Sequence, residues 1–386
     1  MSKNILLGIT SSIASYKAYE LIRQYKKYGF NVKTIISENA LNFVSPLVLE
    51  TLTGERCCYE QFIPRDNTQH INLCDWADVF VVAPLSANTI SKFAQGICDN
   101  LLTSVFCAYL GTKKPILLAP AMNANMWNNP LIQKNLQILK DFNCEIVDVE
   151  KGFLACGTED IGRLASIDKI YMKTHRLVEQ DKKNNSKKVI ITIGGTQENI
   201  DEVRFISNAS SGKMGYCLAD CAYFKGYDVC AVATIKKDKP YKVLEVKTAL
   251  DILETLKNEN FDYLIMAAAV GDFRVENQVQ GKIKKEELET LELKLIKNPD
   301  VVAEISENKA ENQTIIGFSL ADKDIEQTAI KKLKSKNLDF IIANKISALN
   351  NDKNMVTIFD KNGKITDIET NSKENIAQKI LEVCFD

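Results

Sequence analysis

Hydrophobic positions in the first part of the chain alternate between short continuous runs and longer segments with helical spacing. Residues 4–10 are almost entirely apolar, and residues 13–28 then repeat apolar side chains every three or four positions. Further short runs rich in Val and Ile lie at 32–37, 79–84, 115–120 and 145–149. Near-continuous apolar strands separated by helices predict a parallel sheet with helices on both faces.

The same plan starts again after a polar stretch. Residues 180–188 carry no apolar side chain and are the clearest linker of the sequence. The pattern after it predicts strands at 189–193, 228–234, 263–270, 314–319 and 340–343, and helices near 213–225, 250–259, 301–309 and 325–336. Asn362-Gly363, between apolar runs at 356–360 and 364–368, predicts a hairpin.

We therefore predict two α/β domains, each a doubly wound and mainly parallel sheet. Their expected bounds are 1–178 and 188–386, with a linker at 179–187. The length of 386 residues also exceeds what a single hydrophobic core usually supports. A hydrophobic fraction of 45% and a charged fraction of 26% are ordinary for a globular protein and argue against disorder.

Charge and targeting features exclude several classes of partner. The formal net charge of -1 gives no reason to expect nucleic acid or an acidic membrane as a partner. No apolar stretch is long enough to span a bilayer, and the amino terminus has no signal-peptide pattern, so we expect a cytoplasmic protein. Eleven cysteines without a CxxC motif are expected to be reduced thiols, and two histidines, His70 and His175, argue against a zinc site.

Small polar residues follow three predicted strands of the first domain, at 10–14, 84–89 and 120–127. Ligands bind at the carboxyl ends of parallel strands, so three such loops at one edge indicate a site. Each loop alone is also explained by helix capping or packing. No GxGxxG motif occurs, so the fingerprint of a nicotinamide-binding domain is missing.

Two side chains of the first domain are candidates for acid–base chemistry. A single histidine such as His70 is more often structural than catalytic when considered alone. Cys156 lies between Gly152 and Gly162, which favours an exposed loop thiol over a core residue.

In the second domain, residues 204–215 combine an arginine, an asparagine, paired serines and two glycines just before a predicted helix. This combination suits a phosphate or a carboxylate, although a serine-capped surface loop also explains it. Asp272 follows a predicted strand, where it suits a base edge or a metal. Lys282 belongs to a lysine run that would ordinarily be a solvated surface.

In the first domain the motifs SSIASYK, QHINL, PLSANTISK, GICDNLLT, PAMNANMW and ACG occur in that order. Over residues 1–173 the chain resembles the homo-oligomeric flavin-containing cysteine decarboxylases. The resemblance implies a flavodoxin-like domain that binds FMN, with His70 as the acid–base residue. It also implies that Asn123 binds the substrate near its carboxylate and that Cys156 protonates an enethiolate. The FMN-binding residues that it implies are Ser11, Ser12, Ile13, Ser37, Ser86, Ala87, Asn88 and Thr89.

The chemistry explains why these residue types are needed. Loss of CO2 from a cysteine amide would leave an unstabilised carbanion, whereas oxidation of the thiol by a flavin first creates an electron sink. We therefore expect the loops at residues 70, 123 and 156 to converge around the flavin. Asp160 departs from the family, which usually has a glycine there; if that position needs a positive φ, Asp is the next-best tolerated residue.

In the second domain the motifs GGT, RFISNASSGKMG, AAAVGDFR, KIKK, KNPDVV and IIGFS occur in that order. Over 188–386 the chain resembles phosphopantothenate–cysteine ligases, which bacteria often fuse to the decarboxylase. The resemblance implies a Rossmann-like domain in which Arg204 and Asn208 contact the activated carboxylate and Lys282 contacts the triphosphate. The CTP-binding residues that it implies are Met266, Ala267, Ala268, Asp272, Lys282, Pro299, Asp300, Val301, Val302, Phe318, Lys332 and Lys336.

Together the two resemblances imply a route in coenzyme A biosynthesis. CTP, with Mg2+, activates 4'-phosphopantothenate as an acyl-cytidylate, the amine of cysteine displaces CMP, and the first domain decarboxylates 4'-phosphopantothenoylcysteine to 4'-phosphopantetheine. The families also imply trimers of the flavin domain joined by ligase dimers into a dodecamer. Gln197 and Gly271 depart from the ligase pattern, and we expect them to tune substrate contacts.

Two other functions are compatible with parts of the sequence. Some relatives of the first domain are flavin-binding regulatory subunits, but retention of His70, Asn123 and Cys156 beside a whole ligase half speaks against this role. A nicotinamide-dependent dehydrogenase would need the glycine-rich fingerprint that is missing.

Overall fold

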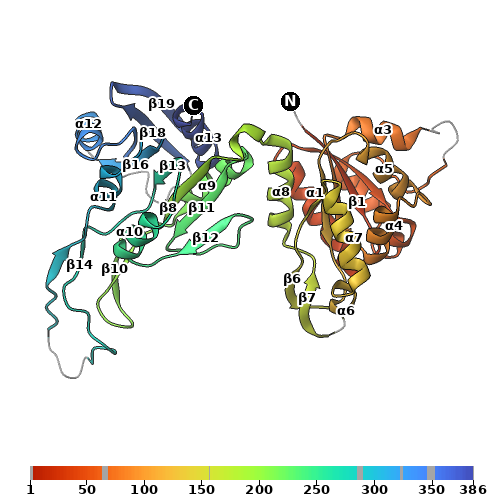
Figure 1. Cartoon of the computed structure of the whole chain (residues 1–386), viewed down its shortest axis with the longest axis horizontal. Coiled ribbons are helices and arrows are strands. Elements are labelled where there is room, and N and C mark those ends of the chain that lie inside the picture. The colour runs from red at the N-terminus through yellow and green to blue at the C-terminus, as the bar shows by residue number, and fades with distance from the viewer. Residues whose placement is uncertain are drawn as a thin grey trace. The chain divides into compact units, whose positions relative to one another are not determined.

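The computed structural model describes residues 3–62, 68–155, 157–284, 290–321, 325–345 and 353–385. The chain forms two compact units, Met1–Glu179 and Gln180–Asp386. Each unit is an α/β structure built on its own mainly parallel sheet, which confirms the predicted fold class (Figure 1).

The first unit contains a five-stranded parallel sheet in the order β2-β1-β3-β4-β5. Its strands are β1 (Asn4–Ile9), β2 (Asn31–Ile36), β3 (Val79–Leu85), β4 (Ile116–Pro120) and β5 (Glu145–Ile146). Its helices are η1 (Ile13–Tyr16), α1 (Lys17–Lys27), η2 (Glu38–Asn42), α2 (Pro46–Thr53), α3 (Gln69–Trp76), α4 (Ala87–Gln95), α5 (Leu101–Leu110), α6 (Ala124–Trp127), α7 (Pro130–Asp141) and α8 (Ile167–Glu179). This strand order is the flavodoxin-like order of a doubly wound sheet.

Apolar residues on alternate positions of each strand fill both faces of this sheet. On one face Phe80 and Val82 of β3 join a core formed with α3, α4, α5 and α7, in which Phe93 stacks on Phe106 at 3.7 Å. On the other face lie α1 and α8, where the Tyr25 hydroxyl hydrogen-bonds to Thr174 at 2.7 Å (Figure 1). The five strands predicted for the first domain correspond to β1 to β5, with shifts of their ends.

One antiparallel hairpin lies outside the first sheet. It consists of β6 (Glu150–Phe153) and β7 (Glu159–Arg163), and the sequence pattern did not predict it. Its strands are short and mostly exposed, so they lack the apolar runs on which strand prediction depends.

The second unit contains an eight-stranded sheet in the order β12-β11-β8-β13-β16-β17-β18-β19. The strands are β8 (Lys188–Ile193), β11 (Asp228–Ala233), β12 (Lys242–Glu245), β13 (Tyr263–Met266), β16 (Thr314–Ala321), β17 (Phe340–Lys345), β18 (Lys353–Asp360) and β19 (Gly363–Ser372). The helices are η3 (Lys182–Asn184), α9 (Lys213–Phe224), α10 (Ala249–Lys257), α11 (Val301–Glu307), α12 (Ile325–Ser335) and α13 (Lys373–Cys384). The six strands from β12 to β17 are parallel in the Rossmann order, and β18 and β19 extend the sheet antiparallel.

Two short antiparallel ribbons accompany this sheet. One pairs β9 (Gln197–Asn199) with β10 (Phe205–Ser207), and the other pairs β14 (Phe273–Val275) with β15 (Leu295–Lys297). The hairpin predicted at Asn362-Gly363 is confirmed by β18 and β19. The strand predicted at 263–270 ends instead at Met266. The residues after it line a pocket and keep one isolated parallel bridge, between Ala269 and Gly195.

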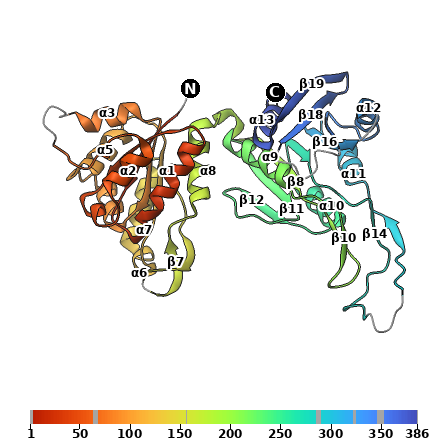
Figure 2. The same ribbon diagram turned by 180° about the vertical axis from the view of Figure 1, so that it is seen from behind.

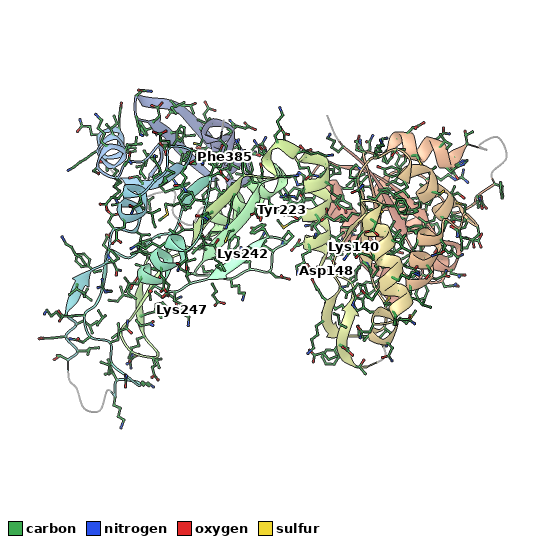
Figure 3. The ribbon with its side chains drawn as sticks, in the orientation of Figure 1. Lys140, Asp148, Tyr223, Lys242, Lys247 and Phe385 are labelled. Carbon is green, nitrogen blue, oxygen red and sulfur yellow. The ribbon has the colours of Figure 1, made fainter. Side chains whose placement is uncertain are left out.

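The last helix closes the second unit. Helix α13, which the sequence pattern did not predict, packs against α9 and buries Ile376, Ile380 and Leu381. Phe385 lies just beyond it and is labelled in Figure 3. Its ring stacks on Tyr263 at a centroid distance of 4.1 Å and contacts Tyr227 edge-on.

The polar stretch predicted as a linker is held on the second unit. The backbone N–H of Asp181 and the side-chain amide of Asn184 both donate to the carbonyl of Lys225, at 3.1 and 3.0 Å. Polar side chains can cap turns as well as solvate a linker, so their composition did not reveal this attachment. No helix in the described part of the chain is long and apolar enough to cross a membrane.

Candidate active sites

The first unit has a pocket of about 620 Å³ at the carboxyl ends of β1, β3 and β4. Three predicted loops and the β6–β7 hairpin form its walls. The predicted residues that line it are Ser11, Ser12, Ile13, Ser86, Ala87 and Asn123.

Thr10 holds two of these loops together. Its hydroxyl donates to the Pro84 carbonyl at 2.9 Å and accepts from the Ser86 N–H at 2.8 Å. The carboxyl ends of β1 and β3 are thereby fixed beside one another, which places Ser12 and Ser86 on one wall.

The serine hydroxyls of this wall also cap helices. Ser12 accepts from the Ala14 N–H and Ser86 accepts from the Thr89 N–H, each at 3.3 Å. Capping and lining the pocket are therefore compatible roles. Thr89 is buried against Ser86 and Asn88 is exposed, and neither lines the pocket.

Ser37 lies at the same edge of the sheet, where its N–H donates to the Ile9 carbonyl at 3.0 Å. It is outside the pocket lining, and its buried hydroxyl has no hydrogen-bond partner among the described residues. A buried hydroxyl that is left unsatisfied is costly, so a ligand group at this edge would be stabilising.

Asn123 caps the short helix α6, with its Oδ1 accepting from the Asn125 N–H at 2.9 Å. The hairpin closes on this loop, because the Met122 N–H donates to the Gly162 carbonyl at 3.0 Å. Gly162 has a φ of +126°, and a Cβ there would lie 2.2 Å from the Met122 carbonyl oxygen. Only glycine fits this approach.

The turn of the hairpin reaches the pocket rim. The Leu154 N–H donates to the Thr158 carbonyl at 2.8 Å, and both Leu154 and Ala155 line the pocket. Cys156, which follows Ala155, lies outside the described residues. Asp160 lies in β7 and is not among the residues with positive φ, so this position does not require glycine for its backbone conformation.

His70 is not brought to this pocket within its own unit. It lies in α3, which leads to the amino end of β3, whereas the pocket lies at the carboxyl ends. Helix α3 and the group of α6 and β7 lie at opposite ends of the unit in both views (Figures 1 and 2). The expected convergence of residues 70 and 123 therefore does not occur inside one chain.

Sequence reasoning missed two cations in the lining of this pocket, Lys17 and Arg163. Burial and then the nearby charge of Arg163 lower the pKa of Lys17, which Glu150 and Glu20 partly offset. Two cations that face one pocket favour an anionic ligand.

The donor set and walls of this pocket fit a flavin mononucleotide. Hydroxyls and cations suit a phosphate, and large apolar side chains suit a flat aromatic ring. Ile13 and Phe153 line the pocket although they are 62% and 77% exposed. Such exposure is typical of side chains that a ligand covers.

The second unit has a pocket of about 810 Å³ at the carboxyl ends of β13, β16 and β17 and the start of α9. Of the residues predicted to bind CTP, all but Lys282 line it. They are Met266, Ala267, Ala268, Asp272, Pro299, Asp300, Val301, Val302, Phe318, Lys332 and Lys336.

Glycines let the backbone approach closely beside this pocket. A Cβ on Gly195 would lie 2.5 Å from the Asn208 carbonyl oxygen, and one on Gly215 would lie 2.9 Å from Ile193. Gly271 donates its N–H to the Thr196 hydroxyl at 2.8 Å, and a Cβ there would lie 3.3 Å from that hydroxyl oxygen. At this position glycine avoids the tight approach that a Cβ would make to the Thr196 hydroxyl.

Asn208 is joined to the loop after β13. Its side-chain amide donates to the Val270 carbonyl at 3.0 Å, and Asn208 lies in the pocket wall. Two cations of the α12 region also line the wall: Lys332 donates to the Ser319 hydroxyl at 3.1 Å, and Lys336 pairs with Asp300 at 2.8 Å.

Arg204 and Lys282 lie outside the lining of this pocket. Arg204 pairs with Asp201 and donates to the Ile283 carbonyl, which follows Lys282. Burial alone would raise the pKa of Asp201. Hydrogen bonds from the backbone N–H groups of Val203, Ile283 and Arg204, and from the Arg204 side chain, instead hold it at about 2.

No cluster of three or more His, Cys, Asp or Glu side chains suited to a metal occurs among the residues that the structure describes. The acidic side chains in the second pocket are Asp272 and Asp300. Together they do not amount to a metal site formed by the protein alone.

Comparison with known proteins covers the whole chain. Residues 1–179 match the family model described as Flavoprotein, and residues 184–386 match the model of the DNA/pantothenate metabolism flavoprotein C-terminal domain. The coenzyme A biosynthesis bifunctional protein CoaBC of Borreliella burgdorferi is 38% identical, with coverage of 100% of this chain and 99% of that protein. The protein of the same name from Bacillus subtilis is 37% identical, with coverage of 99% and 96%.

Solved structures resemble the chain over about half of its length. The FMN binding protein AtHal3 is 34% identical over 45% of this chain and 95% of its own, with a TM-score of 0.41. The C-terminal domain of a coenzyme A biosynthesis bifunctional protein CoaBC is 30% identical over 52% of this chain and 95% of its own, with a TM-score of 0.45.

Proposed function

The chain belongs to the family of coenzyme A biosynthesis bifunctional proteins, and from that premise we propose which residues perform its decarboxylase and ligase reactions. The observation that carries the proposal is that each unit has a pocket at the carboxyl edge of its sheet, lined by the family's motif residues. The ligase unit joins cysteine to 4'-phosphopantothenate, and the flavin unit decarboxylates the product to 4'-phosphopantetheine.

In the flavin unit the proposed cofactor is FMN. Ser11, Ser12 and Ser86 hold its phosphate end, and Ser37 supplies a further hydroxyl at the same edge. The bound flavin supplies a hydride acceptor and donor next to the substrate thiol. Asn123 orients the substrate near its carboxylate, and Cys156, next to the lining residue Ala155, protonates carbon after CO2 has left.

His70 acts as the base in this proposal, although it does not line the pocket of its own chain. A homo-oligomer resolves the discrepancy, because the His70 of one copy can complete the pocket of a neighbour. We therefore propose that the flavin units form trimers. Paired ligase units join these trimers in a cytoplasmic assembly.

In the ligase unit CTP occupies the larger pocket, with Lys332 and Lys336 near its negative charge. Asn208 holds the carboxylate that is activated as an acyl-cytidylate, and the amine of cysteine then displaces CMP. Mg2+ enters with CTP, since several negative groups converge and the described carboxylates form no metal site by themselves. Arg204 and Lys282, which lie outside the pocket of their own chain, act across the paired ligase units.

Separate loss of the two activities tests this division. We expect His70→Asn to abolish CO2 release from 4'-phosphopantothenoylcysteine and leave CTP-dependent consumption of cysteine intact, and Asn208→Asp to do the reverse. Both reactions are measured on the purified full chain, with the visible spectrum as the check for bound flavin. A folded, flavin-loaded protein without either activity would refute the proposal.

A further inference from the structure

Lys373 is a buried cation in the larger pocket that no motif pointed to. It is the first residue of α13, it is 8% exposed, and it lines the pocket. Its side chain has no hydrogen bond or ion pair with any of the residues that the structure describes. A lysine buried to this degree is normally paired.

A second unsatisfied polar group lines the same pocket. The Oδ1 atom of Asn344 in β17 is buried and has no hydrogen-bond partner within the described residues. Ile341 and Ala343 belong to the core on the α12 side of the sheet, so Asn344 faces the other side by strand alternation. That side carries α9 and α13.

The surroundings of Lys373 are otherwise suited to an anion. Its charge acts on Cys217 in α9. The N-cap of α9 is Gly212, which has no side chain to cap the helix, and the start of α9 lines the same pocket. Ser372 caps α13 by accepting from the Asn375 N–H. By contrast, Lys332 and Lys336 already have partners in Ser319 and Asp300. Of these three lysines, Lys373 is therefore the one whose ammonium group is best suited to bind an anionic ligand in the pocket.

We propose that Lys373 binds a phosphate group of a ligase substrate, with the N–H groups at the start of α9 as further donors. This inference rests on the proposed function, since it assigns a residue to the ligase site. Two substrates carry the required group, CTP and 4'-phosphopantothenate, and the experiment separates them. Lys373 is a binding residue in this proposal and takes no part in bond making.

The test compares Lys373→Met with Lys379→Met in the full chain. Methionine keeps the length and the apolar stem of lysine but removes its charge. Lys379 is an exposed lysine of the same helix and serves as the matched control. CTP with Mg2+ and 4'-phosphopantothenate are titrated separately by calorimetry, with inorganic pyrophosphate as a probe that needs no turnover.

For Lys373→Met we expect about 10- to 100-fold weaker binding of one of the two substrates, because a charge-assisted hydrogen bond is lost. The affected substrate identifies the source of the phosphate. Lys379→Met should bind both substrates as the wild type does.

Binding of both substrates by Lys373→Met within about twofold of wild type would overturn the inference. If that variant does not fold, Lys373→Gln is measured and interpreted in the same way. A wild-type protein that binds CTP but shows no ligation would instead contradict the proposed function and leave the comparison of binding intact.

Discussion

At the scale of single residues, His175 shows how burial sets a charge state. It lies in α8, where its ring contacts Phe30 edge-on at 5.3 Å and its Nδ1 hydrogen-bonds with the Tyr171 hydroxyl at 3.1 Å. Burial lowers its pKa to about 4. The neutral ring is therefore part of the packing of the first unit.

We predict that His175 makes stability depend on pH between about 6.5 and 4. The unfolded chain gains a proton on His175 as the pH falls below about 6.5 and the folded chain does not, so stability is lost until the pH reaches the folded pKa. The loss should be roughly 2–4 kcal/mol. Phenylalanine cannot titrate, so the unfolding free energy of His175→Phe should not show this loss between the same pH values.

Urea unfolding followed by tryptophan fluorescence checks this prediction. Both tryptophans, Trp76 and Trp127, lie in the first unit, so the signal reports on the unit that contains His175. Equal pH dependence in the wild type and His175→Phe would contradict the assigned pKa.

Gly162 is a second residue whose effect can be isolated. In Gly162→Ala the new methyl group would clash with the Met122 carbonyl and push the hairpin away from the loop of Asn123. We expect decarboxylation to fall by about 100-fold, because small displacements of positioning groups are costly, and ligation to stay unchanged. Loss of ligation as well would show that the change had unfolded more than the hairpin.

Residues placed directly after strands could be predicted from the sequence, and residues placed by long-range packing could not. Ser11, Ser86 and Asn123 line their pocket as expected because strand ends fix their position. Lys17 and Lys373 were missed because a lysine at the start of a helix looks like a solvated charge, and its burial depends on elements far away in the chain.

At the scale of elements, the segment between β9 and β10 is tied to the lysine-rich segment by one carboxylate. Asp201 accepts from the backbone N–H groups of Val203, Arg204 and Ile283. The parts around residues 201 and 283 are far apart in the sequence, so the run of lysines read alone gave no sign of this attachment. The structure thus explains how Arg204 and Lys282 come to be neighbours.

We predict that this tie weakens in acid. The pKa of Asp201 is depressed in the folded state, so its contribution to stability is present above about pH 4 and is lost as the pH falls toward about 2. Asp201→Asn should therefore be less stable than wild type at pH 6, and the difference should shrink at pH 2–3. Urea unfolding followed by circular dichroism measures the difference.

Ligation provides the control for the same variant. Asp201→Asn should lower ligation, since Arg204 loses its charged partner, and leave decarboxylation intact. A stability difference that is independent of pH would show that Asp201 is not charged in the folded protein.

Whole elements followed from the hydrophobic pattern where the pattern was long and regular. The buried strands β1, β3, β8 and β11 were predicted because each is an apolar run. Helix α13 and the hairpin β6–β7 were missed. The hairpin is polar, and the six buried residues of α13 are spread among polar and charged ones. Both form walls of pockets, so the elements hardest to predict are those that complete the sites.

At the scale of the whole molecule, the separation of His70 from Asn123 makes a prediction about assembly. Chains carrying His70→Asn and chains carrying Asn123→Asp should each be inactive in decarboxylation. If each site takes these residues from different copies, an equal mixture assembled by co-expression should recover about a quarter of the wild-type decarboxylation.

The mixture is compared with the two variants that are purified separately and then mixed without exchange of subunits. Activity no higher than in that control would mean that both residues act within one copy. Ligation should be at the wild-type level in every sample, which checks that the assemblies are folded.

The presence of two compact units on one polypeptide fixes the ratio of the two enzymes in the cell. Each round of translation produces one copy of both units. Their ratio is therefore one to one and cannot be adjusted by gene expression. Any imbalance between the two steps must therefore be corrected by turnover rates. A mutation that slows one unit would make its substrate accumulate, however much of the chain is produced.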